Sequence, residues 1–282
     1  MKWDSVFPEI VSIKTADAKT YLASSLTDTY QLLDVRQPDE FMKQHIPGAL
    51  LLPLKDLITG KVVLDKEKPT LVYCKNGERS LAACQWMIGD DFKDVRHILG
   101  GIDSWSGNKA SGPSGLNLNL LKQDTEFSDA ISMAFAMEEG LRLFYMELAR
   151  ETDDETFKKL YRKLASLEVE HKSDLSKKYL LVEGKELIQK EIEERQAQIM
   201  EGGGSADITL IKSLAGAEDA VDIFGLALAF EIQAFDFYVR LSRHTVRPEV
   251  KGFFLEMADA EKMHLAFISA EMDTYLKTHK DL

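Results

Sequence analysis

Residues 164–175 read LASLEVEHKSDL, a stretch that carries Glu168 and His171 three positions apart. On a helix, residues three apart lie on the same face about one turn from each other, so both side chains can reach one point. A Glu-x-x-His pair is common on solvated helix surfaces and by itself predicts no site. The same pair returns 93 residues later as Glu261 and His264, within MADAEKMHLAFI (257–268).

The repeat extends to the segments that precede each pair. A glutamate lies 30 residues before each Glu-x-x-His, at Glu138 and at Glu231. A tyrosine follows each of these glutamates after seven residues, at Tyr145 and at Tyr238. Matched positions at one constant offset are hard to obtain by chance, so the sequence predicts a duplicated pair of helices.

Apolar periodicity places the four repeated glutamates on the core-facing sides of their helices. Glu138 shares the spacing of Phe135 and Leu141, whereas Glu139 and Glu170 are predicted to face away from the core. A buried carboxylate without a partner costs several kcal/mol, so four of them require positive charge nearby. His171 and His264 are the only basic side chains on the predicted core stripes, which carry no Lys or Arg. We therefore expect bound metal cations to supply the positive charge.

One glutamate from each of two helices and a Glu-x-x-His pair from each of the other two form the arrangement of carboxylate-bridged dinuclear centres. The predicted ligands are Glu138, Glu168, His171, Glu231, Glu261 and His264. Carboxylates with imidazoles favour iron or manganese, with zinc as a substitute, and four carboxylates offset two divalent ions. We therefore expect two iron ions per chain. Tyr145 and Tyr238 are interpreted either as core tyrosines with hydrogen-bonded hydroxyls or as hydrogen-bond partners of the ligands.

The region 124–282 resembles the ferritin-like superfamily, and most closely the rubrerythrin group. The resemblance implies a four-helix bundle with a di-iron centre held by the six residues above, and a homodimer. The chain departs from that group in two respects. Ala234 stands where rubrerythrins carry a further glutamate, and no four-cysteine rubredoxin domain is present. Peroxide reduction by the rubrerythrin cycle is therefore in question, and an external electron donor is expected.

The chain changes character near residue 108. Before it, short apolar runs alternate with helix-like segments, which predicts an α/β domain with a mostly parallel sheet. Expected strands are YQLLDV (30–35), GALLLPL (48–54) and TLVYC (70–74), and expected helices cover 16–25 and 80–87. Residues 109–123 are interpreted as a linker between a domain at 1–108 and an all-α domain at 124–282. Expected helices of the second domain cover about 125–150, 154–182, 185–200, 207–243 and 247–278.

The segment CKNGERS (74–80) follows the third expected strand directly. Gly77 allows a tight turn before a helix, so backbone N–H groups and a helix N-terminus should point at Cys74 and stabilise a thiolate or persulfide. Cys84, inside the following apolar helix, is interpreted as structural. Arg79 is expected to hold the loop by pairing with a carboxylate, either Asp34 or Glu40. The candidate active loop consists of Cys74, Lys75, Asn76, Gly77, Glu78, Arg79 and Ser80, with Asp34 in support.

Residues 5–108 resemble the rhodanese family of sulfurtransferases. Four segments in the right order carry the resemblance: LLDVRQPDEF (32–41), QHIPGALLLPL (44–54), CKNGERS (74–80) and LGGIDSW (99–105). It implies that Cys74 takes sulfane sulfur as a persulfide and passes it to a nucleophilic acceptor. Four residues separate Cys74 from Arg79, whereas the loops of related phosphatases have five. The shorter loop suits one sulfur atom, so sulfur transfer is favoured over phosphate hydrolysis.

Composition limits the classes of function. The 282 residues carry a formal net charge of −12, which argues against nucleic acid as a partner. Two cysteines are too few for the disulfide framework of a secreted domain. The N-terminal MKWDSVFPEI lacks an apolar signal core, and no run approaches the ~18 apolar residues of a membrane span. We therefore expect a cytoplasmic protein without a membrane partner.

Three hypotheses about function remain open on these grounds. The first is a two-domain enzyme in which Cys74 carries sulfur and the di-iron site reduces peroxide or O2, or oxidises a sulfur species. Its partners are small-molecule sulfur donors and acceptors, the oxidant and an electron donor. The second is iron handling, of a ferroxidase or storage type, with an accessory sulfurtransferase domain. The third is a non-catalytic sensor or docking protein.

Overall fold

Strand β4 (Thr70–Tyr73) is buried along its whole length and lies at the centre of a five-stranded sheet. Its residues are apolar except for Thr70, as expected for a strand covered on both faces. The computed structural model describes residues 10–186 and 220–278. The chain divides into two compact units, Met1–Leu116 and Asn117–Leu282.

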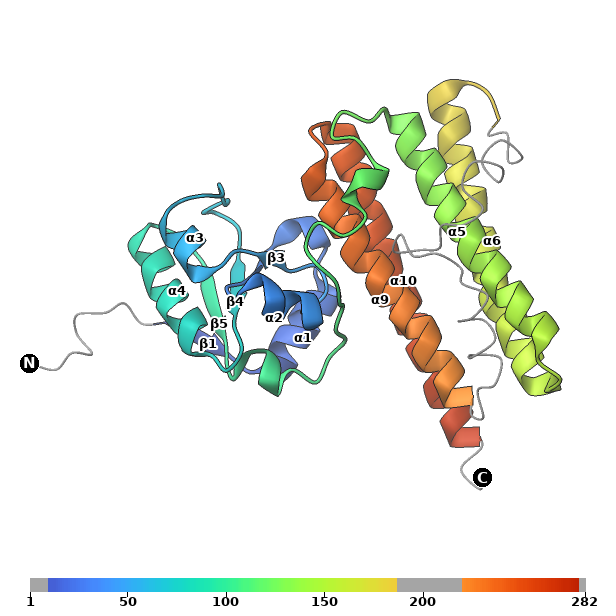
Figure 1. Ribbon diagram of the computed structural model, residues 1–282, viewed down its shortest axis with the longest axis horizontal. Coiled ribbons are helices and arrows are strands. Elements are labelled where there is room, and N and C mark those ends of the chain that lie inside the picture. The colour runs from blue at the N-terminus through green and yellow to red at the C-terminus, as the bar shows by residue number, and fades with distance from the viewer. Residues whose placement is uncertain (1–9, 187–219, 279–282) are drawn as a thin grey trace, which may run out of the picture. The chain divides into compact units, whose positions relative to one another are not determined.

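All pairings in the sheet of the first unit are parallel, in the order β1-β5-β4-β2-β3. Figure 1 labels β1, β3, β4 and β5. The strands are β1 (Val11–Ile13), β2 (Gln31–Asp34), β3 (Leu50–Leu51), β4 and β5 (Val95–Ile98). The α-helices between them are α1 (Thr15–Ser24), α2 (Pro38–Lys43), α3 (Leu54–Ile58) and α4 (Glu78–Gly89). The predicted α/β class with a parallel sheet is therefore confirmed.

Two apolar clusters cover the two faces of this sheet. Leu71 and Tyr73 pack in one cluster with α1 and α2, whereas Val72 packs in the other with α3 and α4. This alternation follows from the two-residue period of a strand. It places Cys74, which follows Tyr73, in the same cluster as α4. The sulfur thus lies at the carboxyl end of the central strand, beside the helix that the next residues form.

Two details of the first unit differ from expectation. The apolar run at 48–54 forms only the two-residue strand β3, because Pro53 ends the pairing and α3 begins at Leu54. Strands β1 and β5 (VRHI) were not expected: β1 has only three residues, and Arg96 and His97 interrupt the apolar pattern of β5. Part of the segment expected to be a linker (109–123) lies within the first unit and pairs with it: Ala110 forms a bridge with His45, and the Gly112 N–H donates to the Met42 carbonyl.

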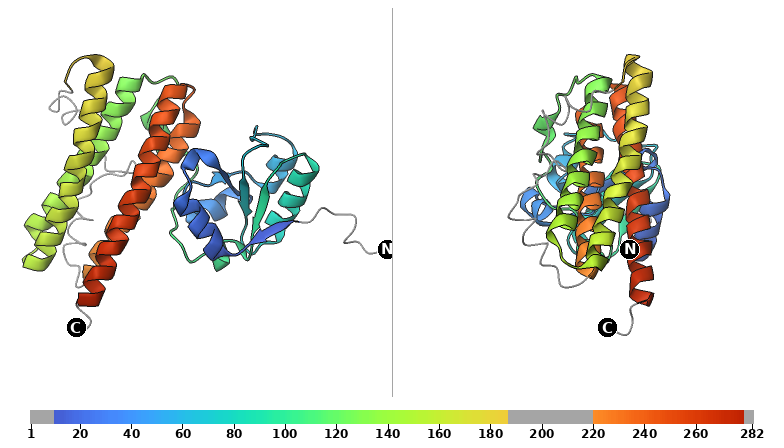
Figure 2. Two further views of the ribbon diagram at one scale, coloured as in Figure 1. Left: turned by 180° about the vertical axis from the view of Figure 1, so that it is seen from behind. Right: turned by 90° about the vertical axis from the view of Figure 1, so that its right-hand side faces the viewer.

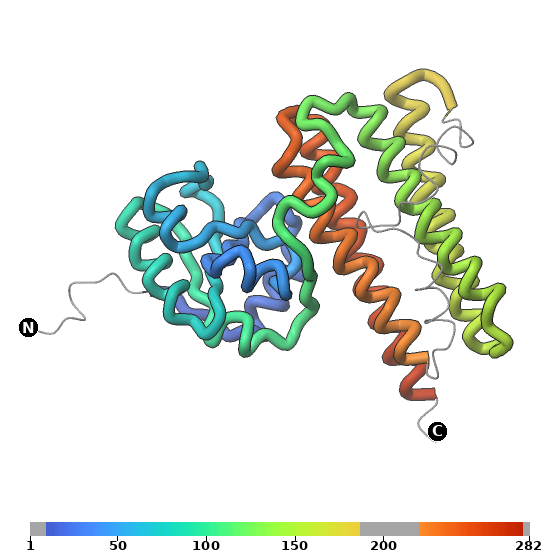
Figure 3. The backbone as a smooth tube through the Cα atoms, viewed as in Figure 1, coloured from blue at the N-terminus to red at the C-terminus, as the bar shows by residue number. Residues whose placement is uncertain are grey.

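In the residues that the structure describes, the second unit contains four long helices in two pairs (Figure 2). They are α5 (Phe127–Glu151), α6 (Glu155–Glu183), α9 (Ala220–His244) and α10 (Pro248–Thr278). Short connections join α5 to α6 and α9 to α10, so the partners in each pair run antiparallel (Figure 3). Residues 187–200 of the helix expected at 185–200, and the start (207–219) of the one expected at 207–243, lie outside the described residues.

Helix ends in this unit have local causes. Asp154 caps α6 by accepting hydrogen bonds from the N–H groups of Thr156 and Phe157, and Gly184 ends the helix in a left-handed conformation with φ of 68°.

Among residues 10–186 and 220–278, none of the helices combines the length and the apolar character that crossing a bilayer requires.

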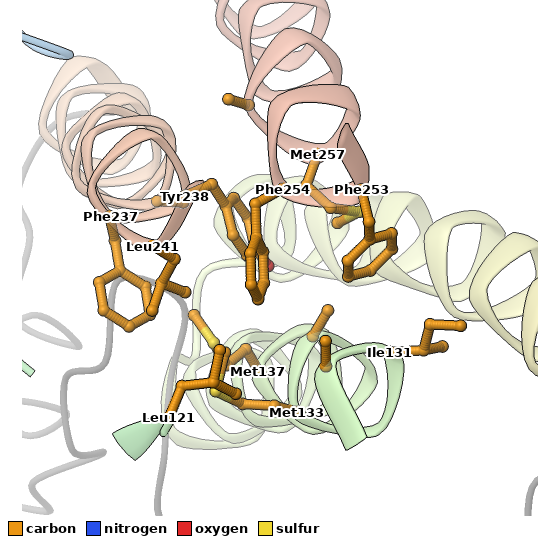
Figure 4. Packing of buried hydrophobic residues seen from close by; sticks show 14 of the residues in the cluster. Leu121, Ile131, Met133, Met137, Phe237, Tyr238, Leu241, Phe253, Phe254 and Met257 are labelled. Atoms are coloured by element: carbon orange, nitrogen blue, oxygen red, sulfur yellow. The ribbon is translucent and has the colours of Figure 1, made fainter. Parts of the chain in front are cut away.

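Two apolar clusters fill the interior of the second unit, and each draws on all four helices. One contains Met137, Tyr238 and Phe254 (Figure 4), and the other contains Leu141 and Tyr145. Along every helix, the repeated glutamate lies between residues of one cluster and residues of the other. The packing therefore leaves one polar layer between two apolar ones, and that layer holds the carboxylates.

Candidate functional site

The loop between β4 and α4 encloses the sulfur of Cys74. Cys74 is fully buried, and Gly77 precedes α4 in a left-handed conformation with φ of 105°. Glycine adopts this conformation without strain, and the turn lets the Gly77 N–H donate to Cys74 Sγ at 3.2 Å. Ser80 Oγ lies 3.5 Å from the same sulfur. Donors that face one sulfur atom favour a negatively charged thiolate or persulfide there.

The other loop residues lie around this centre. Lys75, Asn76 and Glu78 are exposed, and Asn76 Oδ1 accepts the Glu78 N–H at 3.4 Å. Their exposure leaves them free to meet a small molecule approaching the loop. Their roles in transfer stay predictions.

The chain after β5 holds the loop by its backbone. The Ile102 N–H donates to the Cys74 carbonyl at 2.9 Å, and the Asp103 N–H donates to the Lys75 carbonyl at 3.0 Å. A Cβ atom at Gly101 would lie 2.3 Å from the Cys74 carbonyl oxygen. Only glycine therefore permits this approach, which explains the second glycine of the LGGIDSW segment.

Arg79 holds α4 to α2 through Glu40. Its Nη1 and Nη2 atoms donate to Glu40 Oε2 and Oε1, each at 2.7 Å. These hydrogen bonds, together with the charge of Arg79, lower the pKa of Glu40 to about 2, although partial burial acts to raise it. Glu40 also accepts the Gln37 N–H, which fixes the start of α2. Of the two partners proposed for Arg79, Glu40 is thus the one that binds it.

Asp34, the alternative partner predicted for Arg79, does not bind it, so this alternative is wrong. It is fully buried and binds Arg36, with Nη2 at 2.6 Å and Nε at 2.9 Å. Because the chain turns directly after β2, the Arg36 side chain, two positions after Asp34, lies closest to its carboxylate. Arg36 also donates to the Gln44 carbonyl, and this pair supports the segment after α2.

Glu40→Gln should lower kcat/KM for sulfur transfer about fivefold, corresponding to ~1 kcal/mol for a partly exposed charged hydrogen-bonded pair. The neutral amide can accept only one of the two Arg79 donors, so the loop is held less firmly. Steady-state thiosulfate–cyanide assays measure the change. Asp39→Asn, at an exposed position on the same helix, is the matched control and should keep wild-type activity. Equal rates for both variants would contradict this role of Glu40.

Cys84 has the properties of a structural cysteine. It is fully buried on α4, and burial raises the pKa of its thiol to about 12, with a further contribution from Cys74. A thiol with that pKa is almost entirely protonated at neutral pH and is a poor nucleophile. The interpretation that Cys84 carries no chemistry agrees with this environment.

Sequence reasoning did not single out His97. It is buried on β5, and its Nε2 lies 3.0 Å from the Gly77 carbonyl oxygen of the loop. No motif marks it in the sequence. Recognising β5 as the neighbour of β4 would have been the one available signal, because it places this side chain beside the loop.

In the second unit, the six predicted ligands form two groups. Glu138, Glu168 and His171 make the first, and Glu231, Glu261 and His264 make the second. Within each group, one ligand atom from every residue lies within 4.8 Å of the others. His171 Nδ1 is 3.2 Å from Glu138 Oε2, and His264 Nδ1 is 2.8 Å from Glu261 Oε2.

The two groups meet at their histidines. The imidazole rings of His171 and His264 stack with centroids 3.7 Å apart and planes within 9°. The residues that α5 and α6 supply to one group therefore adjoin those that α9 and α10 supply to the other. Two Glu-Glu-His groups so placed are consistent with a di-metal site.

The buried carboxylates of this layer are in an environment that metal cations would stabilise. Glu138 Oε1 and Glu168 Oε2 are buried and, within the described ranges, accept no hydrogen bond. Burial raises the pKa of Glu168 well above its ordinary range, and the charges of Glu138 and Glu231 raise it further. Buried oxygens without donors and mutually repelling carboxylates are what a pair of divalent ions would satisfy.

The prediction that Glu139 faces away from the core is wrong. Glu139 is buried between α5 and α6, where it binds Arg142 and the buried Lys172. A buried lysine is thus present, contrary to the expectation that no Lys or Arg reaches the core, but its partner is Glu139. The predicted exposure of Glu170 is confirmed, and it provides a control position two residues from Glu168.

Tyr145 and Tyr238 are fully buried, one in each apolar cluster of the second unit. Their rings pack against aromatic neighbours, Tyr145 against Phe144 and Tyr238 against Phe254. This packing agrees with their interpretation as core tyrosines. A direct hydrogen bond from either hydroxyl to a metal ligand stays a prediction.

Comparison with known proteins gives a result for each unit. A family model for a rhodanese-like domain matches residues 17–108, and one for rubrerythrin matches residues 222–281. A thiosulfate sulfurtransferase of Coxiella burnetii is 34% identical over 86 residues, which cover 30% of this chain and 80% of that protein. A sulfurtransferase of Allochromatium vinosum is 32% identical over 87 residues, covering 30% of this chain and 81% of the relative.

Solved structures with similarity to the chain include a rhodanese-like domain protein from Staphylococcus aureus. It is 25% identical with a TM-score of 0.32, and the match covers 35% of this chain and 94% of that one. A rhodanese-related protein from Thermoplasma volcanium is 28% identical with a TM-score of 0.32, covering 36% of this chain and 97% of the other.

Proposed function

Because the chain belongs to the rhodanese family through residues 17–108 and carries a rubrerythrin domain at residues 222–281, we propose that it is a two-domain sulfur and redox enzyme. Cys74 would carry sulfane sulfur as a persulfide. The helical unit would hold two iron ions that act on peroxide or O2, or on a sulfur species. The observation that carries the proposal is the presence of a buried thiol in a donor-lined loop and of two Glu-Glu-His groups in one chain.

Sulfur transfer would proceed in two displacements at Cys74. The thiolate attacks the outer sulfur of thiosulfate, the S–S bond of the donor breaks, and sulfite leaves with the bonding electrons. The Cys74 persulfide then gives its terminal sulfur to a nucleophile such as cyanide, and the thiolate leaves. The Gly77 N–H, which faces Sγ at 3.2 Å, would stabilise the negative charge in both resting states. Four residues between Cys74 and Arg79 support sulfur as the transferred group.

Each Glu-Glu-His group would hold one iron ion through its two carboxylates and its imidazole. Iron bound there would supply the two electrons that reduction of a peroxide requires. The four carboxylates balance the charge of two divalent ions, and apolar clusters flank the layer on two sides. Manganese or zinc could occupy the same ligands.

A cavity of about 150 Å³ gives a small molecule access to this layer. Glu138, His171 and His264 line it, together with the apolar side chains of Leu175 and Met257. The imidazoles therefore face both the metal position and a space that a peroxide or O2 molecule fits. A cytoplasmic location, a homodimer and an external electron donor remain part of the proposal.

One observation favours a second candidate, oxidation of iron as the substrate. Ala234 is fully buried where rubrerythrins carry a further glutamate, so the helical unit offers one carboxylate fewer. A site with fewer carboxylates would hold its ions less tightly, as a site that passes iron on requires. In that case the rhodanese domain would serve a separate pathway.

Rapid mixing of the ferrous protein with hydrogen peroxide and, separately, with O2 tests these candidates. We expect oxidation by peroxide at least about tenfold faster than that of free ferrous iron under the same conditions. Faster reaction with O2 than with peroxide, followed by release of ferric iron, would indicate the second candidate. If neither oxidant reacts faster than with free iron, the redox function is excluded and a sensor or docking role is left.

A further inference from the structure

The carbonyl oxygen of Gly77 has more donors around it than it can accommodate. A carbonyl oxygen has two lone pairs, and three groups contact this one at 3.0 Å each: the Leu81 N–H, Ser80 Oγ and His97 Nε2. Ser80 is fully buried, has one hydroxyl hydrogen, and has a second acceptor in Cys74 Sγ at 3.5 Å. Whether the Ser80 hydrogen goes to the Gly77 carbonyl or to Cys74 Sγ therefore depends on whether His97 donates to that carbonyl.

The sheet holds His97 in place for this contact. Its Cα pairs with Ser12 on β1 and with Val72 on β4, so the residue is fixed from both sides. Because a carbonyl oxygen only accepts, Nε2 carries the ring hydrogen, and Nδ1 can then accept the Ser12 hydroxyl at 3.3 Å. Burial lowers the pKa of His97, although the Gly77 hydrogen bond acts to raise it, so the neutral ring predominates.

We propose that His97 is a positioning residue for sulfur transfer: by donating to the Gly77 carbonyl alongside the Leu81 N–H, it leaves the Ser80 hydroxyl hydrogen for Cys74 Sγ. Without His97 the hydroxyl turns to the nearer carbonyl, and the sulfur loses a donor. His97 itself does not touch the sulfur. The inference rests on the proposed function of Cys74 as the sulfur carrier.

A double-mutant cycle on the full chain tests this coupling. His97→Leu and Ser80→Ala should each lower kcat/KM for thiosulfate and cyanide about fivefold, the loss expected for one ordinary hydrogen bond, because the Ser80 Oγ–Cys74 Sγ contact is long at 3.5 Å. The double variant should lie within about twofold of Ser80→Ala alone, because the histidine acts through the serine. Independent action would instead multiply the two losses to about 25-fold. His97→Gln, which keeps a donor of similar reach, should restore activity to within about twofold of the wild type.

A second readout separates this inference from the proposed function. The rate at which iodoacetamide alkylates Cys74 at pH 7, followed by mass spectrometry of its peptide, reports the reactivity of the sulfur without any turnover. The alkylation rates of the two single variants and the double variant should show the same non-additive pattern, even if the chain transfers no sulfur. Wild-type alkylation and activity in His97→Leu, or multiplicative losses in the double variant, would overturn the proposal. If His97→Leu fails to fold, as judged by thermal melting, His97→Asn replaces it, since its shorter amide cannot reach the Gly77 carbonyl.

Discussion

Replacing Cys74 with serine should abolish sulfur transfer, lowering kcat/KM for thiosulfate and cyanide by at least about 10³-fold. A serine hydroxyl has no accessible anion at neutral pH and cannot form a persulfide. The loop would keep its geometry, because the Gly77 N–H can donate to oxygen as it does to sulfur. The loss would therefore measure the chemistry of the thiol rather than the fold of the loop.

Cys84→Ser is the matched control for that prediction. Its thiol is buried and its pKa is about 12, so it should contribute no nucleophile, and activity should remain within about twofold of the wild type. Mass spectrometry after incubation with thiosulfate should find one added sulfur atom on the peptide containing Cys74. Activity that survives Cys74→Ser and disappears in Cys84→Ser would assign the nucleophile to the helix instead of the loop.

Glu168→Ala should reduce the metal content of the anaerobically purified protein from about two ions per chain to about one or fewer. Glu168 is buried in the polar layer between the two apolar clusters, and an alanine there leaves its position without an oxygen ligand. His264→Ala should have the same effect on the second group. Elemental analysis of the iron-loaded chain gives the content directly, and the melting temperature should fall on chelation, because bound ions stabilise the folded state.

Glu170→Ala controls for the loss of a carboxylate from α6. Glu170 is exposed two residues after Glu168, so this variant removes the same charge without reaching the polar layer. It should keep about two ions per chain and the wild-type melting temperature. Full metal content in Glu168→Ala and in His264→Ala would show that the two Glu-Glu-His groups are not the metal site.

Much of the helical unit could be predicted because its signals are periodic and repeated. Glu138 lies in an apolar stripe, and a stripe with a 3.6-residue period shows which face turns inward. The constant offset of 93 residues then links positions that no local pattern could connect. The burial of Glu139 could not be predicted in this way, because its partner Lys172 comes from another helix and only packing brings the two together.

The first unit shows a similar division between local and distant signals. The CKNGERS segment was recognisable, since a cysteine at a strand end followed by glycine and a helix is a local pattern. The partner of Arg79 was not, because Asp34 and Glu40 both lie far from it in the sequence. Strand β5 was missed because a charged and a polar residue interrupt it, and His97 was missed with it.

The amino-acid sequence by itself thus determined the two domains' fold classes, the cysteine of the loop and the set of six residues gathered in the polar layer. Each of these depends on spacing along one segment or on a repeat of it. Only the tertiary structure decided that Glu40 binds Arg79, that Asp34 binds Arg36, and that His97 reaches the Gly77 carbonyl. The physical reason is that a side chain takes the nearest complementary group in space, and strand order and helix packing determine which group that is.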